Sequence, residues 1–254
     1  MEIRNIIEKI AKEKEGKGGI QNVVWVAAGG SNGGNYPAQY FMDREAKSIR
    51  SQMFTSNEFV YAPPKFVGEN TIAVITSMRG TPETCVAAQV AKDLGAVTIG
   101  LYVQESLLTE TCEYNIKYDS IMFDESDQSK TNAALGMRIA MDIVDVAEGY
   151  EHYADAMAAY DILDKVYNDA KEYCMPLAKK WAMQNKDEHV NLCHGKRPGV
   201  CGGIYLFHLQ YYGNASDSVA YHQLLRILPR SVRSAGQERI LLPACIGRKD
   251  KEGG

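Results

Sequence analysis

One stretch of the chain decides the fold: Ile72-Ala73-Val74-Ile75-Thr76-Ser77-Met78-Arg79-Gly80-Thr81-Pro82-Glu83-Thr84. It begins with an apolar run of strand length and turns through hydroxyl and glycine residues. Thr81 is a typical N-cap, Pro82 suits the first helical position, and Glu83 suits the first turn. The stretch therefore predicts a buried strand that leads directly into a helix.

The same pattern recurs on both sides of this stretch. Apolar runs at residues 22–28, 96–101 and 114–118 predict further strands, and helical patterns follow from Tyr36 to Lys47 and around Val86, Val90 and Leu94. Apolar strands that alternate with amphipathic helices are typical of a parallel sheet covered on both faces. We therefore predict an α/β fold, a three-layer αβα sandwich with a mostly parallel sheet.

Helical segments flank this core. The N-terminal segment carries isoleucines at helical spacing on one face, and residues 131–147 form one helix. Residues 153–183 form a long helical region that we expect Pro176 to kink or end. These apolar helices favour core packing or a dimer surface over a cofactor box, so a homo-oligomer is predicted.

Composition excludes several classes of function. The 254 residues carry a formal net charge of −4, which argues against nucleic acid or a membrane surface as partner. No apolar run approaches the roughly 20 residues that span a bilayer. The charged N-terminus does not fit a secretory signal, and six cysteines without a C-x-x-C pair indicate reduced thiols in the cytoplasm. No metal-ligand spacing and no cofactor motif are present, so neither is expected.

Two strands end in loops whose residues suit a phosphate group. Glycines allow close backbone approach, amides and hydroxyls donate hydrogen bonds, and the following helix dipole favours negative charge. In an open parallel sheet, ligands bind at the carboxyl ends of the strands. The predicted phosphate- and substrate-binding residues are Gly30, Ser31, Asn32, Gly33, Thr76, Ser77 and Thr81.

Structural explanations compete with this one. A glycine-rich turn also serves as a tight strand–helix connection, and Thr81 also serves as a cap alone. The spacing fits neither a P-loop nor a dinucleotide fingerprint. Two hydroxyl-rich turns on neighbouring βα units nevertheless favour a binding site.

The run from Ile75 to Thr84 resembles the signature S-x-S-G-x-T-x-E-T of the SIS (sugar isomerase) domain family, and Gly29-Gly30-Ser31 resembles that family's first loop. The resemblance extends over residues 23–121 and is nearest to fructosamine-6-phosphate deglycases of the fructoselysine type. These are similar to the isomerase half of glutamine–fructose-6-phosphate aminotransferase. Arg79 departs from the pattern, because it stands where the family usually has glycine. It either reaches an anionic group of the substrate, such as an amino-acid carboxylate, or is simply solvated.

From Asn191 the composition changes: acids become rare and no helical or strand period persists. Back-translated with suitably chosen third bases and read one base out of frame after Val190, the residues can give I-Y-V-M-G-S-G-P and, further on, E-F-F-H-G-P-F-E, which resemble a second SIS copy. We therefore expect residues 1–190 to form the SIS domain with its following helices. Residues 191–254 are expected to be an aberrant tail left by a frameshift, or else a genuine divergent tail.

The resemblance implies a small-molecule sugar phosphate as partner. An intact relative would convert fructosamine 6-phosphate into glucose 6-phosphate and an amine, which requires a positioned acid or base. In the slipped frame that group would lie in E-F-F-H-G-P, so no catalytic residue is assigned in this chain. Alternatives are a non-catalytic sugar-phosphate-binding module and another aldose–ketose phosphosugar isomerase.

Overall fold

The computed structural model describes residues 2–120, 126–185, 191–194 and 244–247. The chain divides into two compact units, Met1–Asp169 and Ala170–Gly254. The first unit holds a five-stranded sheet in the order β2-β1-β3-β4-β5, with every neighbouring pair parallel. Its strands are β1 (Asn22–Ala27), β2 (Arg50–Thr55), β3 (Thr71–Ser77), β4 (Val97–Tyr102) and β5 (Tyr114–Lys117).

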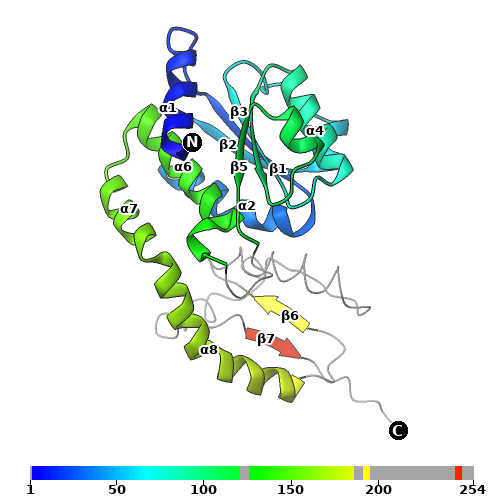
Figure 1. Cartoon of the computed structure of the whole chain (residues 1–254), viewed down its shortest axis with the longest axis vertical. Helices are drawn as coiled ribbons and strands as arrows, with labels where there is room; N and C mark the ends of the chain where they lie inside the picture. Colours follow the sequence, from blue (N-terminus) through cyan, green and yellow to red (C-terminus); the bar gives the residue numbers. More distant parts are fainter. Residues whose placement is uncertain (1, 121–125, 186–190, 195–243, 248–254) are drawn as a thin grey trace, which may run out of the picture. The chain divides into compact units, whose positions relative to one another are not determined.

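Side chains of β1 alternate between two hydrophobic cores, one on each face of the sheet. Val23 and Trp25 belong to one core, and Val24 and Val26 belong to the other. The first core is covered by α1 (Ile3–Lys14), α2 (Gly29–Glu45) and α6 (Asn132–Glu148), and the second by α3 (Ser56–Tyr61), α4 (Pro82–Asp93) and α5 (Leu107–Thr111) (Figure 1). The predicted three-layer α/β sandwich is confirmed.

Two elements near the sheet edge were not predicted from the sequence. Strand β2 lies at the edge and buries Phe54 alone, so it lacks the continuous apolar run that marks the inner strands. Helix α3 has only six residues, and it is held by a capping box in which Thr55 and Glu58 bond each other's backbone amides. Short elements and edge elements show only weak hydrophobic periodicity, so the sequence pattern does not reveal them.

Helix α4, which the sequence predicted around Val86 and Val90, packs on the sheet mainly through small residues. Val86 and Leu94 are 48% and 40% exposed, whereas the helix packs on the sheet through Ala87, Ala88 and Ala91. Small side chains let the helix axis approach the strands closely. A sequence pattern based on large apolar residues does not reveal such an alanine face. By contrast, the isoleucine face of α1 is confirmed, with Ile6, Ile7 and Ile10 no more than 2% exposed.

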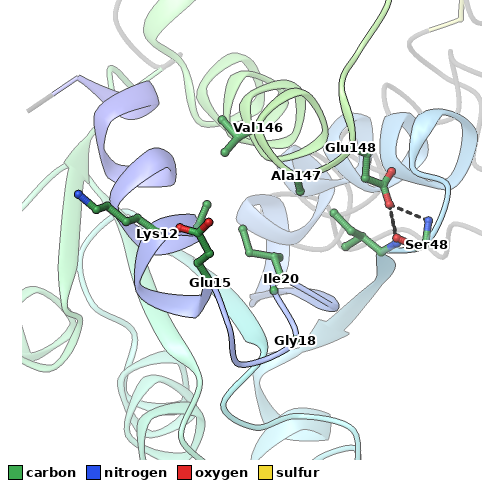
Figure 2. A pocket seen from close by; sticks show the side chains of 11 residues that line it. Lys12, Glu15, Gly18, Ile20, Ser48, Val146, Ala147 and Glu148 are labelled. Atoms are coloured by element: carbon green, nitrogen blue, oxygen red, sulfur yellow. Dashed lines mark hydrogen bonds between the residues drawn. The ribbon is translucent and has the colours of Figure 1, made fainter.

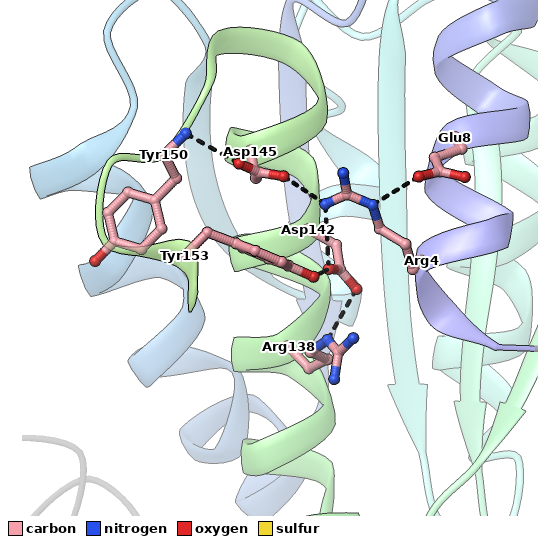
Figure 3. Close-up of polar contacts among 7 residues, drawn as sticks. All are labelled: Arg4, Glu8, Arg138, Asp142, Asp145, Tyr150 and Tyr153. Carbon is pink, nitrogen blue, oxygen red and sulfur yellow. Dashed lines mark hydrogen bonds and ion pairs between the residues drawn. The ribbon is translucent and has the colours of Figure 1, made fainter. Parts of the chain in front are cut away.

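Helix α6 is preceded by a short 3-10 helix, η1 (Gln128–Lys130), and Thr131 occupies its N-cap position. A buried ion-pair network joins α6 to α1 and to α7 (Tyr153–Asp161) (Figure 3). The carboxylate of Asp142 is fully buried; it lies 3.0 Å from Nε of Arg138 and accepts a hydrogen bond from the Tyr153 hydroxyl. Nη1 of Arg4 lies 3.7 Å from this carboxylate and 2.6 Å from that of Asp145.

The C-terminal helical region is broken elsewhere than predicted. Helix α7 ends at Asp161, and α8 (Leu163–Asn185) continues through Pro176. In the second unit, β6 (Asn191–His194) pairs antiparallel with β7 (Ala244–Gly247). The predicted domain boundary after Val190 stays a prediction, and the rest of the tail lies outside the described residues.

Candidate functional site

The predicted loops follow two adjacent strands. β1 and β3 pair in parallel, with Ala27 opposite Thr76, so the two loops that follow these strands begin at the same edge of the sheet. The helices that follow them, α2 and α4, pack on opposite faces of the sheet. The sheet order reverses at this point, because β1 has β2 on one side and β3 on the other. In open α/β sheets, such a switch point is where ligands bind.

The first loop is the beginning of a helix. α2 starts at Gly29, which has φ +56°, rather than near Tyr36 as predicted. A helix leaves the amides of its first residues without intrahelical partners, so Gly29, Gly30 and Ser31 are the donors at this end. The amides of Asn32 and Gly33, which the sequence analysis counted as donors, lie far enough into the helix to join its hydrogen-bond ladder. A role for Asn32 and Gly33 in ligand binding stays a prediction.

Close packing explains the run of glycines in α2. Gly33 and Gly34 are buried. A Cβ atom on Gly34 would lie only 2.1 Å from Nδ2 of Asn132, the first residue of α6. Glycine at position 34 is therefore required by the contact between α2 and α6, a structural reason that the sequence analysis did not predict.

One face of α2 carries polar side chains toward the end of β3. Asn35 is fully buried and its Oδ1 accepts a hydrogen bond of 3.0 Å from the hydroxyl of Thr76. Asn32 lies one helical turn nearer the N-terminus on that face. Its Oδ1 is buried and has no hydrogen-bond partner among the described residues. Buried polar atoms are rarely left without a partner, so this oxygen indicates a place for a donor from outside the chain.

The hydroxyl of Ser31 contacts Tyr118, the residue after β5. Burial raises the pKa of Tyr118 to about 12, and a hydrogen bond with the Ser31 side chain opposes that shift. Tyr118 is therefore a neutral hydroxyl at neutral pH. It was not predicted as a site residue, since no motif surrounds it.

The second loop is closed by its own hydroxyl groups. The amide of Thr81 donates to Oγ of Ser77 at 2.9 Å, and the two hydroxyls are 2.9 Å apart. The chain of hydroxyls continues from Thr81 to Thr84 at 3.1 Å and from Thr84 to Ser56 at 2.8 Å. We call Ser77, Thr81, Thr84 and Ser56 the hydroxyl chain.

Exposure differs along the hydroxyl chain. Ser77, Thr84 and Ser56 are buried, and Thr81 is exposed at the N-terminus of α4. Thr81 is the N-cap residue and Pro82 the first helical residue, as predicted, although the Thr81 side chain makes no capping bond. The sequence analysis named Ser77 and Thr81 as site residues but not Thr84 and Ser56. Ser56 lies 28 positions before its partner Thr84 in the sequence.

Neighbouring segments hold this loop in place. The carbonyl of Met78 accepts hydrogen bonds from the amides of Val103 and Gln104 at 3.2 and 2.9 Å. Gly80 has φ +70°, and a Cβ atom there would lie 2.3 Å from Oγ of Ser106. Thr76, also a predicted site residue, is fully buried and connects β3 to α2 through Asn35.

A surface hollow of about 560 Å3 lies at the opposite edge of the sheet (Figure 2). Its lining includes Ile20 and Ile49, which precede β1 and β2, together with Glu15, Ser48 and Glu148. The Glu148 carboxylate accepts hydrogen bonds from Ser48 and from the backbone amides beside it. The lining carries two carboxylates and one cation, Lys12, so it is negative on balance and suits a phosphate less well than the donor-rich loops do.

Within residues 2–120 and 126–185 and the short β6 and β7 segments, no group of three His, Cys, Asp or Glu side chains is placed to hold a metal ion. In the same part of the chain, none of the helices has the length and apolar character needed to cross a membrane.

Known proteins resemble this chain over most of its length. No family model matches the chain. The curated relative is fructosamine deglycase FrlB of Bacillus subtilis (strain 168), which is 34% identical over 185 residues, or 71% of this chain and 56% of that protein. The chain thus spans just over half the length of this relative.

Solved structures of other proteins also resemble this chain in sequence and fold. A Salmonella typhimurium LT2 protein assigned as a phosphosugar isomerase superposes with a TM-score of 0.71 at 34% identity, over 76% of this chain and 58% of that one. A Bacillus subtilis protein of the same assignment gives 0.67 at 32% identity, over 73% and 56%. The C-terminal domain of glucosamine-fructose-6-phosphate aminotransferase from Francisella tularensis shares the fold at 14% identity, with a TM-score of 0.67 over 87% of this chain and 67% of that one. With the paired loops at the switch point of a parallel sheet, these similarities place the chain in the SIS (sugar isomerase) domain family.

Proposed function

We propose that this chain binds the phosphate group of a phosphorylated, amino-substituted sugar where β1 and β3 end. The observation that carries the proposal is that two donor-rich loops, the amides at the start of α2 and the hydroxyls of Ser77 and Thr81, follow paired strands at one edge of the sheet. The buried Asn32 Oδ1, which has no partner among the described residues, lies on the helix face that contacts β3 and would bond the sugar. A sugar hydroxyl is a donor of the right kind for this oxygen. The relatives that match the chain, a fructosamine deglycase and proteins assigned as phosphosugar isomerases, support the choice of ligand.

The phosphate would be bound by groups of the two loops. The amides of Gly30 and Ser31 are free at the N-terminus of α2, and the positive end of the helix dipole favours an anion there. In the second loop, the hydroxyls of Ser77 and Thr81 bond each other and can turn toward phosphate oxygens instead. Thr81 is exposed, so this end of the hydroxyl chain is open to a ligand.

We further propose that the chain descends from a deglycase that converts fructosamine 6-phosphate into glucose 6-phosphate and an amine. That reaction moves protons between C1 and C2 of the sugar and therefore needs a positioned acid or base. The loops at the switch point offer mainly amides and hydroxyls. We expect binding with little or no turnover, in a cytoplasmic homo-oligomer.

Calorimetric titration with fructose 6-phosphate, and with fructose as a control lacking phosphate, tests the binding site. The wild-type chain should bind only the phosphorylated sugar. Ser77→Ala and Thr81→Val should each weaken binding about tenfold, since a hydrogen bond to a charged group contributes about 1.5 kcal/mol or more. Ser48→Ala, which removes an exposed hydroxyl at the opposite edge of the sheet, is the matched control. Equal affinities of the three variants would refute the site.

A turnover assay separates the candidate functions. A non-catalytic binding module is the second candidate, because the residues of the two loops offer amides and hydroxyls rather than an acid or base. Such a module binds fructosamine 6-phosphate without releasing glucose 6-phosphate. Release of glucose 6-phosphate would instead show a deglycase, and its formation from fructose 6-phosphate would show an aldose–ketose isomerase.

A further inference from the structure

Arg79 lies at the apex of the second loop and is not used by the proposed phosphate contacts. Its side chain is exposed and makes no hydrogen bond or ion pair within the described part of the chain. It is also the only lysine or arginine in segments 28–34, 76–84 and 102–109, which form or support the two loops. The positive charge nearest to the proposed site in sequence is thus available to a ligand.

The backbone on both sides of Arg79 is fixed. Before it, the Met78 carbonyl accepts two amide hydrogen bonds from the segment after β4. After it, Gly80 packs against Ser106, and the Thr81 amide donates to Ser77. A charged side chain on a fixed backbone loses less conformational freedom when it binds than one on a mobile loop. This arrangement suits recognition of a ligand group better than it suits a purely solvated residue.

We propose that Arg79 recognises a second anionic group of the ligand, the carboxylate of the amino-acid part of a fructosamine 6-phosphate. The inference rests on the proposed function. Ser77 and Thr81 would bind the phosphate at the base of the loop. Arg79 lies at the apex of the loop, and its side chain is exposed to solvent. A guanidinium group presents a planar pair of donors that matches a carboxylate. Glu83, the carboxylate nearest in sequence, forms no ion pair with it in the described part of the chain.

Three ligands distinguish a carboxylate contact from a phosphate contact. They are fructose 6-phosphate, the fructosamine 6-phosphate made from butylamine, and that made from glycine; only the last has a carboxylate. Arg79→Gln should weaken binding of the glycine derivative about fivefold, as expected for an exposed charge pair. It should leave the other two affinities within about twofold of wild type. Arg79→Lys should retain part of the preference, and Arg44→Gln, an exposed arginine in the last turn of α2, is the matched control.

Each outcome decides the question. Equal weakening for all three ligands would show that Arg79 contacts the phosphate, and no weakening for any would show a solvated residue; either result overturns the inference. If the wild-type chain binds none of the three, the proposed function itself fails. If fructose 6-phosphate binds but the glycine derivative gains nothing from Arg79, only the inference about the carboxylate fails.

Discussion

The hydroxyl of Thr76 donates a hydrogen bond of 3.0 Å to Oδ1 of Asn35, although the two residues are 41 positions apart. Both side chains are fully buried. The bond connects the end of β3 to the second turn of α2, and so it fixes the first helix of the proposed site against the strand that leads into the second loop. The geometry of the proposed site therefore depends on a contact between two fully buried side chains.

This contact should contribute measurably to stability. Thr76→Val removes the donor, leaves Asn35 Oδ1 unpaired, and should lower the free energy of unfolding by about 2 kcal/mol. In urea denaturation, Asn35→Leu combined with Thr76→Val should cost less than the sum of the two single changes, because both remove one bond. Strict additivity would mean that the bond does not form in solution.

Gly80 should be the more sensitive of two glycines with similar backbone conformations. Gly149→Ala places a Cβ atom in open space at φ +74° and should cost about 1 kcal/mol. Gly80→Ala has φ +70° and also drives the new Cβ against Ser106, so it should cost about 3 kcal/mol and weaken fructose 6-phosphate binding. Thermal unfolding and calorimetry of both variants check this, and equal losses would contradict the packing at Gly80.

The buried carboxylate of Asp142 should be essential to the junction of α1, α6 and α7. Asp142→Ala leaves Arg4 and Arg138 without this partner and should lower the free energy of unfolding by about 3 kcal/mol. Asp155→Ala, an exposed position on α7, should have little effect. Denaturant unfolding of both variants provides the comparison; similar stabilities would show that the network contributes little.

Glu148 should make stability depend on pH. Burial by itself would raise the pKa of this carboxyl, but hydrogen bonds from the amides of Lys47, Ser48 and Ile49 and from the Ser48 hydroxyl outweigh burial and lower it below the ordinary 4.5. A lowered folded-state pKa stabilises the protein above the unfolded pKa, and this stabilisation is lost as pH falls through the folded pKa.

Urea unfolding of the wild type and of Glu148→Gln should therefore differ most at pH 7 and converge toward pH 3. Glu151→Gln, an exposed neighbour, is the control. A difference between wild type and Glu148→Gln that does not change with pH would contradict the effect of ionisation.

The gene itself provides the last test. If residues 191–254 result from a frameshift, the nucleotides across codons 185 to 195 should contain a one-base slip, and the shifted frame should encode the second SIS copy. The alignment with the deglycase covers 71% of the chain, which leaves more than a quarter unmatched. An uninterrupted frame with no second copy in any other frame would defeat the hypothesis.

The sequence by itself determined the sheet and the family. The inner strands are continuous apolar runs because both of their faces are buried, and Thr81, Pro82 and Glu83 mark a helix start through local chemistry alone. Ser77 and Thr81 could be identified because they lie four positions apart in one loop. Such features depend on neighbours in the sequence.

Tertiary structure decided the rest. The edge strand β2 buries few side chains, so its sequence lacks a continuous apolar run. Helix α4 packs through alanines rather than through Val86 and Leu94. The partners Asn35, Ser56 and Tyr118 come from distant segments, so no local motif announces them. Hydrogen bonds between remote residues form only after the chain has packed two helices onto opposite faces of one sheet, and that packing is what brings the site together.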